Sequence, residues 1–206
     1  MTPDEIQTFF TRRDGSFLCA RWGRPVVPVV FGVDDATLAT VKGGIEAVVT
    51  LAGHRMAETD PELGANLMIF FFRDWDELPQ LPNLDRLIPD LGPLCARLEA
   101  AGANQYRAFR FDAEGAIRAV FVFLRMDAHL SAMPAADLAL AQAAEAMLSW
   151  GEGAFAAAAP LARAGQTVIL RPAISGLIRA AYDPALPAVA RDPAHAYRLA
   201  ARLSAA

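Results

Sequence analysis

The sequence predicts an α+β fold: a mixed sheet of four or five strands with a central hairpin, helices packed on one face, and a helical C-terminal third. Strand-like and helix-like segments alternate up to residue 126, and helical periodicity dominates the rest of the chain. Hydrophobic residues make up 54% of the 206 residues and charged residues 20%, a ratio that supports a sizeable core and excludes a disordered chain. We therefore expect a single domain over residues 1–206.

Helix ends are marked in the N-terminal half of the chain. Thr2 can cap a helix that has Pro3 in its first turn, and Glu5 can complete a capping box. Asp34 begins a second helix, in which apolar residues recur at helical spacing until Gly53 ends it. Further helices are predicted at residues 90–101, 134–150 and 172–182, and from Asp192 onward.

Strand-like runs are rich in β-branched and aromatic residues. Residues 26–31 form one such run, and Pro25 and Pro28 place it at an edge of the sheet because proline cannot donate to a ladder. Residues 66–73 are apolar on both faces, which is typical of a central strand. Short strands are also predicted at residues 56–59 and 167–170.

The hairpin is formed by residues 104–111 and 116–126 around the turn Asp112-Ala113-Glu114-Gly115. Alternation along its second strand places Ile117 on the same face as Phe121 and Phe123. The hairpin also carries four arginines: Arg107, Arg110, Arg118 and Arg125. They form an anion-binding patch if they share a face, and the polar margin of the sheet if they do not.

Charge and hydropathy exclude several classes of partner. The net charge of −4 and the isoelectric point near 5.4 give no electrostatic footprint for nucleic acid or for an anionic membrane. The most apolar run, residues 67–72, is far shorter than the ~20 residues of a membrane span. The N-terminus lacks a secretion signal, which predicts a cytoplasmic protein. Cys19 and Cys95 stand among apolar residues and are predicted to be buried thiols.

Few residues are candidates for catalysis or for metal binding. The chain lacks an H-E-x-x-H pair, a phosphate-binding glycine loop and a G-x-S-x-G elbow, so we predict no cofactor and no metal site. Gln142 and Glu145 stand three residues apart on a predicted helix and can share a face, either as a metal or acid–base site or as an ordinary solvated face. Together with His129 they are the candidate catalytic residues. Otherwise we interpret His54, His129 and His195 as surface or capping residues.

Several segments occur together in an order that resembles a known family. They are RWGRPV at residues 21–26, GANLMI at 64–69, the helix that carries Gln142, and LIRAAYDP at 177–184. The order resembles an uncharacterised bacterial family, a domain of unknown function whose fold is zincin-like and related to metallopeptidases. Other members carry glutamate where this chain has Ala139, cysteines in the later half, and export signals. The resemblance therefore implies a cytoplasmic member that lacks the metal motif and does not catalyse.

Three functions remain open on the sequence. We favour a non-catalytic binding or interaction domain, which an exposed Trp75 or Trp150 would support because aromatic anchors concentrate binding energy. The second is a zincin-like metal-dependent hydrolase with an unusual site built from Gln142, Glu145 and His129. The third is a small-molecule-binding domain with an apolar pocket lined by Phe70, Phe72, Phe121 and Phe123. The expected partner is an unidentified protein or small molecule, and neither nucleic acid nor a membrane.

Overall fold

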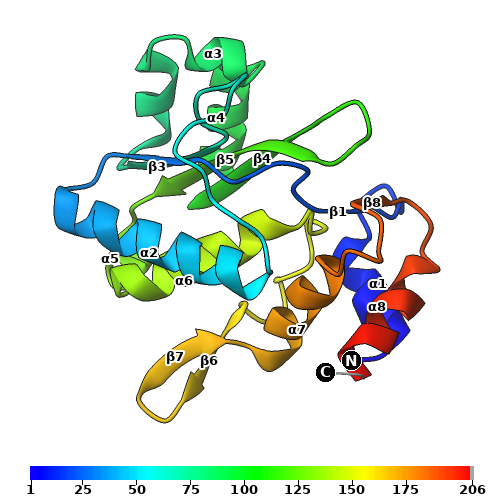
Figure 1. Cartoon of the computed structure of the whole chain (residues 1–206). Helices are drawn as coiled ribbons and strands as arrows, with labels where there is room; N and C mark the ends of the chain where they lie inside the picture. Colours follow the sequence, from blue (N-terminus) through cyan, green and yellow to red (C-terminus); the bar gives the residue numbers. More distant parts are fainter. Residues whose placement is uncertain (205–206) are drawn as a thin grey trace.

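The computed structural model describes residues 1–204 and contains a mixed four-stranded sheet with the order β2-β3-β5-β4 (Figure 1). Strands β2 (Pro28–Phe31), β3 (Leu67–Phe72) and β5 (Ile117–Arg125) run parallel to one another. Strand β4 (Gln105–Phe111) pairs antiparallel with β5 and forms one edge. The α+β class and the four-stranded sheet are confirmed. The predicted hairpin is β4–β5, of which β5 is interior and β4 is an edge.

The strand predicted at residues 56–59 is wrong. Only an isolated bridge between Val26 and Met56 remains there. Downstream, the backbones of Asp60 and Gly64 exchange hydrogen bonds of 2.9 and 2.8 Å. The segment therefore pairs with Val26 at a single point and then closes a tight turn before β3 begins, so no continuous ladder forms.

A β-bulge changes the faces of the second hairpin strand. The register pairs Arg110 with Ala119 and Phe111 with Ile117, so Arg118 has no partner in the ladder. An extra residue in one strand reverses the alternation beyond it. Ile117 consequently joins the opposite core from Phe121 and Phe123, which corrects the shared face expected for these three residues.

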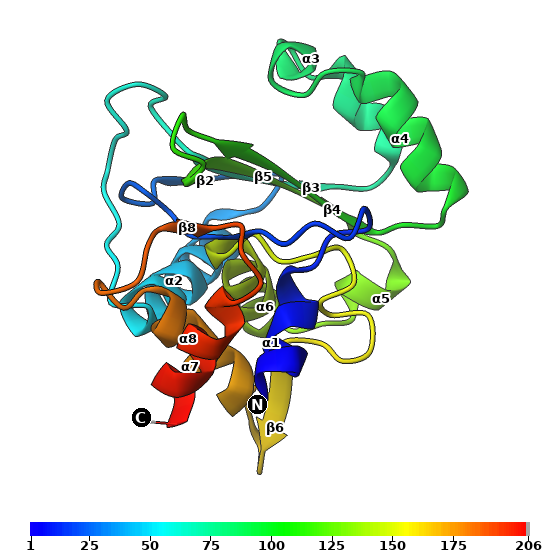
Figure 2. The same cartoon turned by 90° about the vertical axis from the view of Figure 1, so that its right-hand side faces the viewer.

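Helices cover both faces of the sheet, and the expectation of a single covered face is wrong (Figure 2). Helices α2 (Asp35–Leu51), α6 (Ala135–Met147) and α7 (Pro172–Ala181) close the larger core on one face. The 3-10 helix η1 (Trp75–Gln80) and helices α3 (Leu84–Leu87) and α4 (Leu91–Ala100) close a second core on the other. Because β3 and β5 are apolar on both faces, each face needs a covering layer.

The four phenylalanines expected to line a pocket belong to the second core. Phe70, Phe72, Phe121 and Phe123 are all buried, and they pack with side chains of η1 and α4. Trp75 of η1 lies among them at 1% exposure and donates its indole N–H to Ala103 O at 2.9 Å. Packing between the sheet and these two helices therefore accounts for the burial of the phenylalanines.

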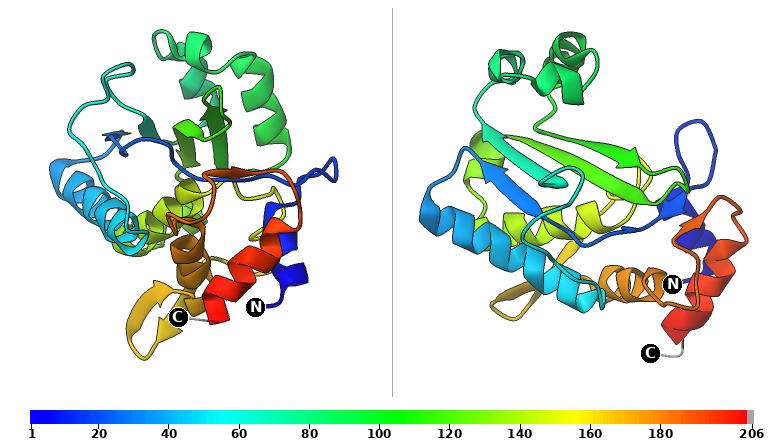
Figure 3. Two further views of the ribbon diagram at one scale, coloured as in Figure 1. Left: turned by 45° about the vertical axis from the view of Figure 1, so that its right-hand side comes forward. Right: turned by 45° about the horizontal axis from the view of Figure 1, so that its top comes forward.

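The remaining elements add side chains to the larger core or extend from it, and the first and last helices lie side by side (Figure 3). Helix α1 (Pro3–Phe10) begins with the predicted capping box and packs beside α8 (His195–Ser204). Strands β1 (Cys19–Ala20) and β8 (Val189–Ala190) pair near these helices. The strand predicted at 167–170 is β7 (Thr167–Leu170), which forms a hairpin with the unpredicted β6 (Leu161–Ala164), and the short helix α5 (Ala128–Ser131) precedes α6.

Both cysteines are free and buried, as predicted. Burial raises the pKa of the Cys19 thiol to about 12 and also raises that of Cys95, so both thiols stay protonated.

None of the helices in residues 1–204 combines the length and apolar character that crossing a membrane requires.

His195 and His54 are more enclosed than the surface positions expected for them. His195, at the start of α8, is only 4% exposed, and its Nδ1 atom has no hydrogen-bond partner within residues 1–204. His54 is half-buried, with Nε2 2.9 Å from Arg24 O and its ring 5.3 Å from that of Tyr182. Burial lowers the pKa of both imidazoles below their ordinary value of 6.5.

We expect the free energy of unfolding to fall as the pH is lowered below about 6.5. Because the folded chain lowers the pKa of His195 and His54, the unfolded chain binds protons more strongly in this range. Above it both forms are neutral and these groups contribute no pH dependence. Urea unfolding from about pH 7.5 to about pH 5.5 measures the effect. His195→Asn should flatten the slope, and a flat wild-type profile would contradict the assignment.

Candidate functional site at the open edge of strand β4

A buried polar network joins β4 to α6. The Arg107 guanidinium donates from Nη1 to Gln142 Oε1 at 2.9 Å and forms an ion pair with Glu145. Gln142 donates from Nε2 to Gln105 Oε1 at 2.8 Å. Gln142 is 3% exposed and Glu145 is 8% exposed. Burial lowers the pKa of Arg107 to about 10, which still leaves the guanidinium charged at neutral pH.

The network excludes one of the two interpretations of the α6 residues. Gln142 and Glu145 do share a face, as their three-residue spacing predicts, but that face is buried and the solvated alternative is wrong. His129 lies elsewhere: it is exposed on α5, and its backbone N–H donates to Asp127 Oδ1 at 3.0 Å. The described residues contain no group of three or more His, Cys, Asp or Glu side chains that could hold a metal ion.

The four hairpin arginines do not form one patch. Arg107 faces α6, whereas Arg110 lies on the opposite face and donates to Leu87 O at 2.9 Å. Arg118, displaced by the bulge, lies 3.5 Å from Glu62, and Arg125 lies 3.9 Å from Asp127. The sheet therefore separates these side chains, and no shared anion site arises from them.

β4 has an unpaired edge within the described part of the chain. It is hydrogen-bonded to β5 alone, and the Arg125 backbone N–H donates to Asn104 O at 2.9 Å. Hydrogen-bonded pairs alternate along an antiparallel ladder, so the backbone N–H and C=O groups of Gln105, Arg107 and Phe109 point away from β5. Among residues 1–204 their only partner is a neighbouring side chain: Phe109 O accepts from Arg110 Nη1 at 3.2 Å.

A groove of about 640 Å³ runs along this edge. Its floor contains every residue of β4. Arg97 and Leu98 of α4 form one wall, and the Arg12–Arg13 turn with residues 150–156 forms the other. Figure 2 shows this arrangement, with α4 on one side of β4 and the segments after α1 and α6 on the other. The open edge of β4 thus forms part of the lining of this groove.

The groove is basic, although the chain as a whole carries a net charge of −4. Five arginines and two glutamates line it. Arg107 is paired with Glu145, but Arg12, Arg13 and Arg97 form no ion pair with any residue between 1 and 204. Aromatic side chains contribute the apolar surface: Tyr106, Phe109, Phe111, Trp150 and Phe155.

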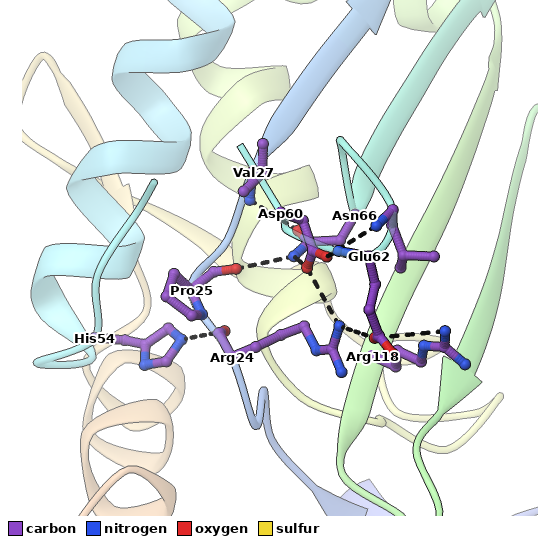
Figure 4. Close-up of polar contacts among 9 residues, drawn as sticks. Arg24, Pro25, Val27, His54, Asp60, Glu62, Asn66 and Arg118 are labelled. Atoms are coloured by element: carbon purple, nitrogen blue, oxygen red, sulfur yellow. Dashed lines mark hydrogen bonds and ion pairs between the residues drawn. The ribbon is translucent and has the colours of Figure 1, made fainter. Parts of the chain in front are cut away.

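A second polar cluster fixes the turn before β3 (Figure 4). Asp60 accepts hydrogen bonds from the backbone N–H groups of Glu62 and Leu63, from Asn66 Nδ2 at 3.0 Å, and from Arg24 Nη1 at 3.4 Å. Asn66, fully buried, also bridges Pro25 O and the Val27 N–H. Burial opposes ionisation of Asp60, yet these donors outweigh it and hold its pKa at about 2. The side chains of Asp60 and Asn66 find their hydrogen-bond partners within the described residues, so we assign the cluster a structural role.

The sequence signals for the groove are indirect. Trp75 and Trp150, the expected aromatic anchors, are both buried, although Trp150 contributes to the groove lining. The Arg12–Arg13 doublet and Arg97 were not singled out, because nothing local indicates that they meet β4. A prediction that residues 104–111 form an edge strand would have indicated the groove, since an unpaired strand edge can pair with another chain.

The resemblance to a zincin-like family rests on the sequence segments described above. Comparisons with protein-family models, with curated proteins and with solved structures found no match to this chain. The β4 groove and the buried network beneath it are therefore the features from which a function is argued.

Proposed function

We propose that this chain is a non-catalytic interaction domain that binds an extended polypeptide segment along the open edge of β4. The observation that carries this proposal is the groove of about 640 Å³ whose floor is the unpaired edge of β4. An exposed strand edge offers N–H and C=O groups at regular spacing, and an incoming strand can pair with them. The groove walls would then contact the alternating side chains of that strand.

The chemistry of the groove supports binding over catalysis. Glu145 lines the groove, but its carboxylate is paired with Arg107, and the Gln142 amide is engaged with Arg107 and Gln105. A general base has to reach the proton that it abstracts, and a carboxylate held by a buried guanidinium is poorly placed for that role. The arrangement instead fixes β4 against α6 and keeps the strand edge in place.

A backbone-specific substitution tests strand addition. The Phe109 N–H points away from β5, so Phe109→Pro removes a donor for an incoming strand without removing a bond of the β4–β5 ladder. Phe109→Ala is the matched control, because it loses the same side chain and keeps the N–H. Peptides selected from a random display library on the wild-type protein should bind Phe109→Pro at least about tenfold more weakly than Phe109→Ala.

Hydrogen exchange supplies an independent readout. In the free protein, the amides of Gln105, Arg107 and Phe109 should exchange faster than those of Tyr106, Ala108 and Arg110, which face β5. Addition of a selected peptide should slow the exchange of the Gln105, Arg107 and Phe109 amides. A library that yields no binder, or binders that Phe109→Pro and Phe109→Ala retain equally, would overturn the proposal.

A further inference from the structure

We infer that the segment bound at β4 combines acidic and apolar residues along its length. This inference rests on the proposed function, because it names the chemistry of the occupant of the same groove. Three observations carry it: the different composition of the two groove walls, the excess of arginine, and the effect of that excess on self-pairing.

The two sides of the groove differ in chemistry. On the α4 side lie Arg97, which is exposed, and Arg110, which shares a face of β4 with Tyr106 and Ala108. On the other side Phe109 and Phe111 stack with their ring centroids 6.2 Å apart, and Phe155 packs on Trp150 at 5.1 Å. Successive side chains of an added strand point to opposite sides. One alternate set of its side chains therefore meets Arg97 and Arg110, and the other meets aromatic rings together with the Arg12–Arg13 turn of that wall.

Positive charge also extends to the far end of the groove. Arg12 and Arg13 lie beside Phe111 in the lining, and Arg13 is exposed. Like Arg97, neither forms an ion pair with a described residue. Charges of one sign that line a groove attract a partner of the opposite sign. The occupant that complements them carries carboxylates along its length.

The same charges disfavour a second copy of this chain as the occupant. Pairing of β4 with β4 of another copy would place the two sets of groove arginines against each other. Juxtaposed like charges oppose association. The added strand is therefore expected to come from a different, acidic partner.

Three fluorescein-labelled peptides test the inference by fluorescence anisotropy: alternating glutamate and valine, glutamine and valine, and lysine and valine. The glutamate peptide should bind about tenfold more tightly than the glutamine peptide at about 0.1 M ionic strength, and the lysine peptide should bind most weakly. The advantage of glutamate should shrink at about 0.5 M. The double variant Arg13→Gln with Arg97→Gln should abolish most of the tighter binding of the glutamate peptide relative to the glutamine peptide. The matched control is Arg86→Gln with Arg163→Gln, two exposed arginines outside the groove, which should retain it.

The outcomes separate this inference from the proposed function. Equal binding of the glutamate and glutamine peptides, both sensitive to Phe109→Pro, would overturn the acidic partner and leave strand addition standing. Binding of none of the peptides, together with a display library that yields no Phe109→Pro-sensitive binder, would overturn both. Displacement of the glutamate peptide by a lower concentration of single-stranded oligothymidylate would replace the acidic peptide with nucleic acid and overturn the inference.

Discussion

Replacement of Arg107 by alanine is expected to lower the free energy of unfolding by about 3–5 kcal/mol. The substitution removes the cation that faces the 8%-exposed Glu145 carboxylate and the donor to Gln142 Oε1. A carboxylate left without its partner in a buried site cannot recover its hydration. Chemical denaturation in urea, with far-ultraviolet circular dichroism as the probe, measures the loss.

A double replacement separates burial of charge from packing. Arg107→Met with Glu145→Met removes both charges and keeps most of the volume, so we expect a far smaller loss than in Arg107→Ala. Wild type, Arg107→Met, Glu145→Met and the double variant form a cycle that gives the coupling energy between the two side chains. A double variant as unstable as the single one would show that the ion pair is not the source of the loss.

Local chemistry made much of the fold predictable from the sequence. The Thr2 capping box, the Asp34 cap and the edge position of residues 28–31 each depend on neighbouring residues, and each was predicted. Coverage of the sheet was predicted less well. The two-sided apolar character of residues 66–73 implied two covering layers, but the prolines between residues 79 and 89 concealed η1 and α3, and only α4 of the second layer was predicted as a helix.

The site depends on contacts between distant segments, and these were not predictable. Arg107 and Gln142 are 35 residues apart, and their spacing carries no information that they meet. The burial of Gln142 had a sequence signal. A helix that is apolar on nearly all sides is itself buried, and α6 carries alanine or leucine at most positions. The groove had no such signal. Its walls come from α4, the turn after α1 and residues 150–156, which only the folded chain brings to β4.

The second large effect concerns the turn before β3. Asp60→Ala is expected to lower the free energy of unfolding by about 3 kcal/mol. The 4%-exposed carboxylate accepts from two backbone N–H groups, from Arg24 and from the fully buried Asn66, and alanine leaves the Asn66 donor without this acceptor. Glu62→Ala is the control. It breaks a shorter contact with Arg24, 2.7 Å, but its exposed side chain can be replaced by water, so only a small fraction of the loss is expected.

Acid titration removes the charge of the Asp60 carboxylate while the side chain keeps its shape. The folded chain holds the pKa of Asp60 at about 2, below its ordinary value of 3.8. A carboxyl whose pKa is lowered by folding stabilises the folded chain above the ordinary value and loses this contribution as the pH falls toward the lower one. The gap in stability between wild type and Asp60→Ala should therefore narrow from about pH 4 to about pH 2. A gap that stays constant over this range would show that Asp60 acts through its shape and not through its charge.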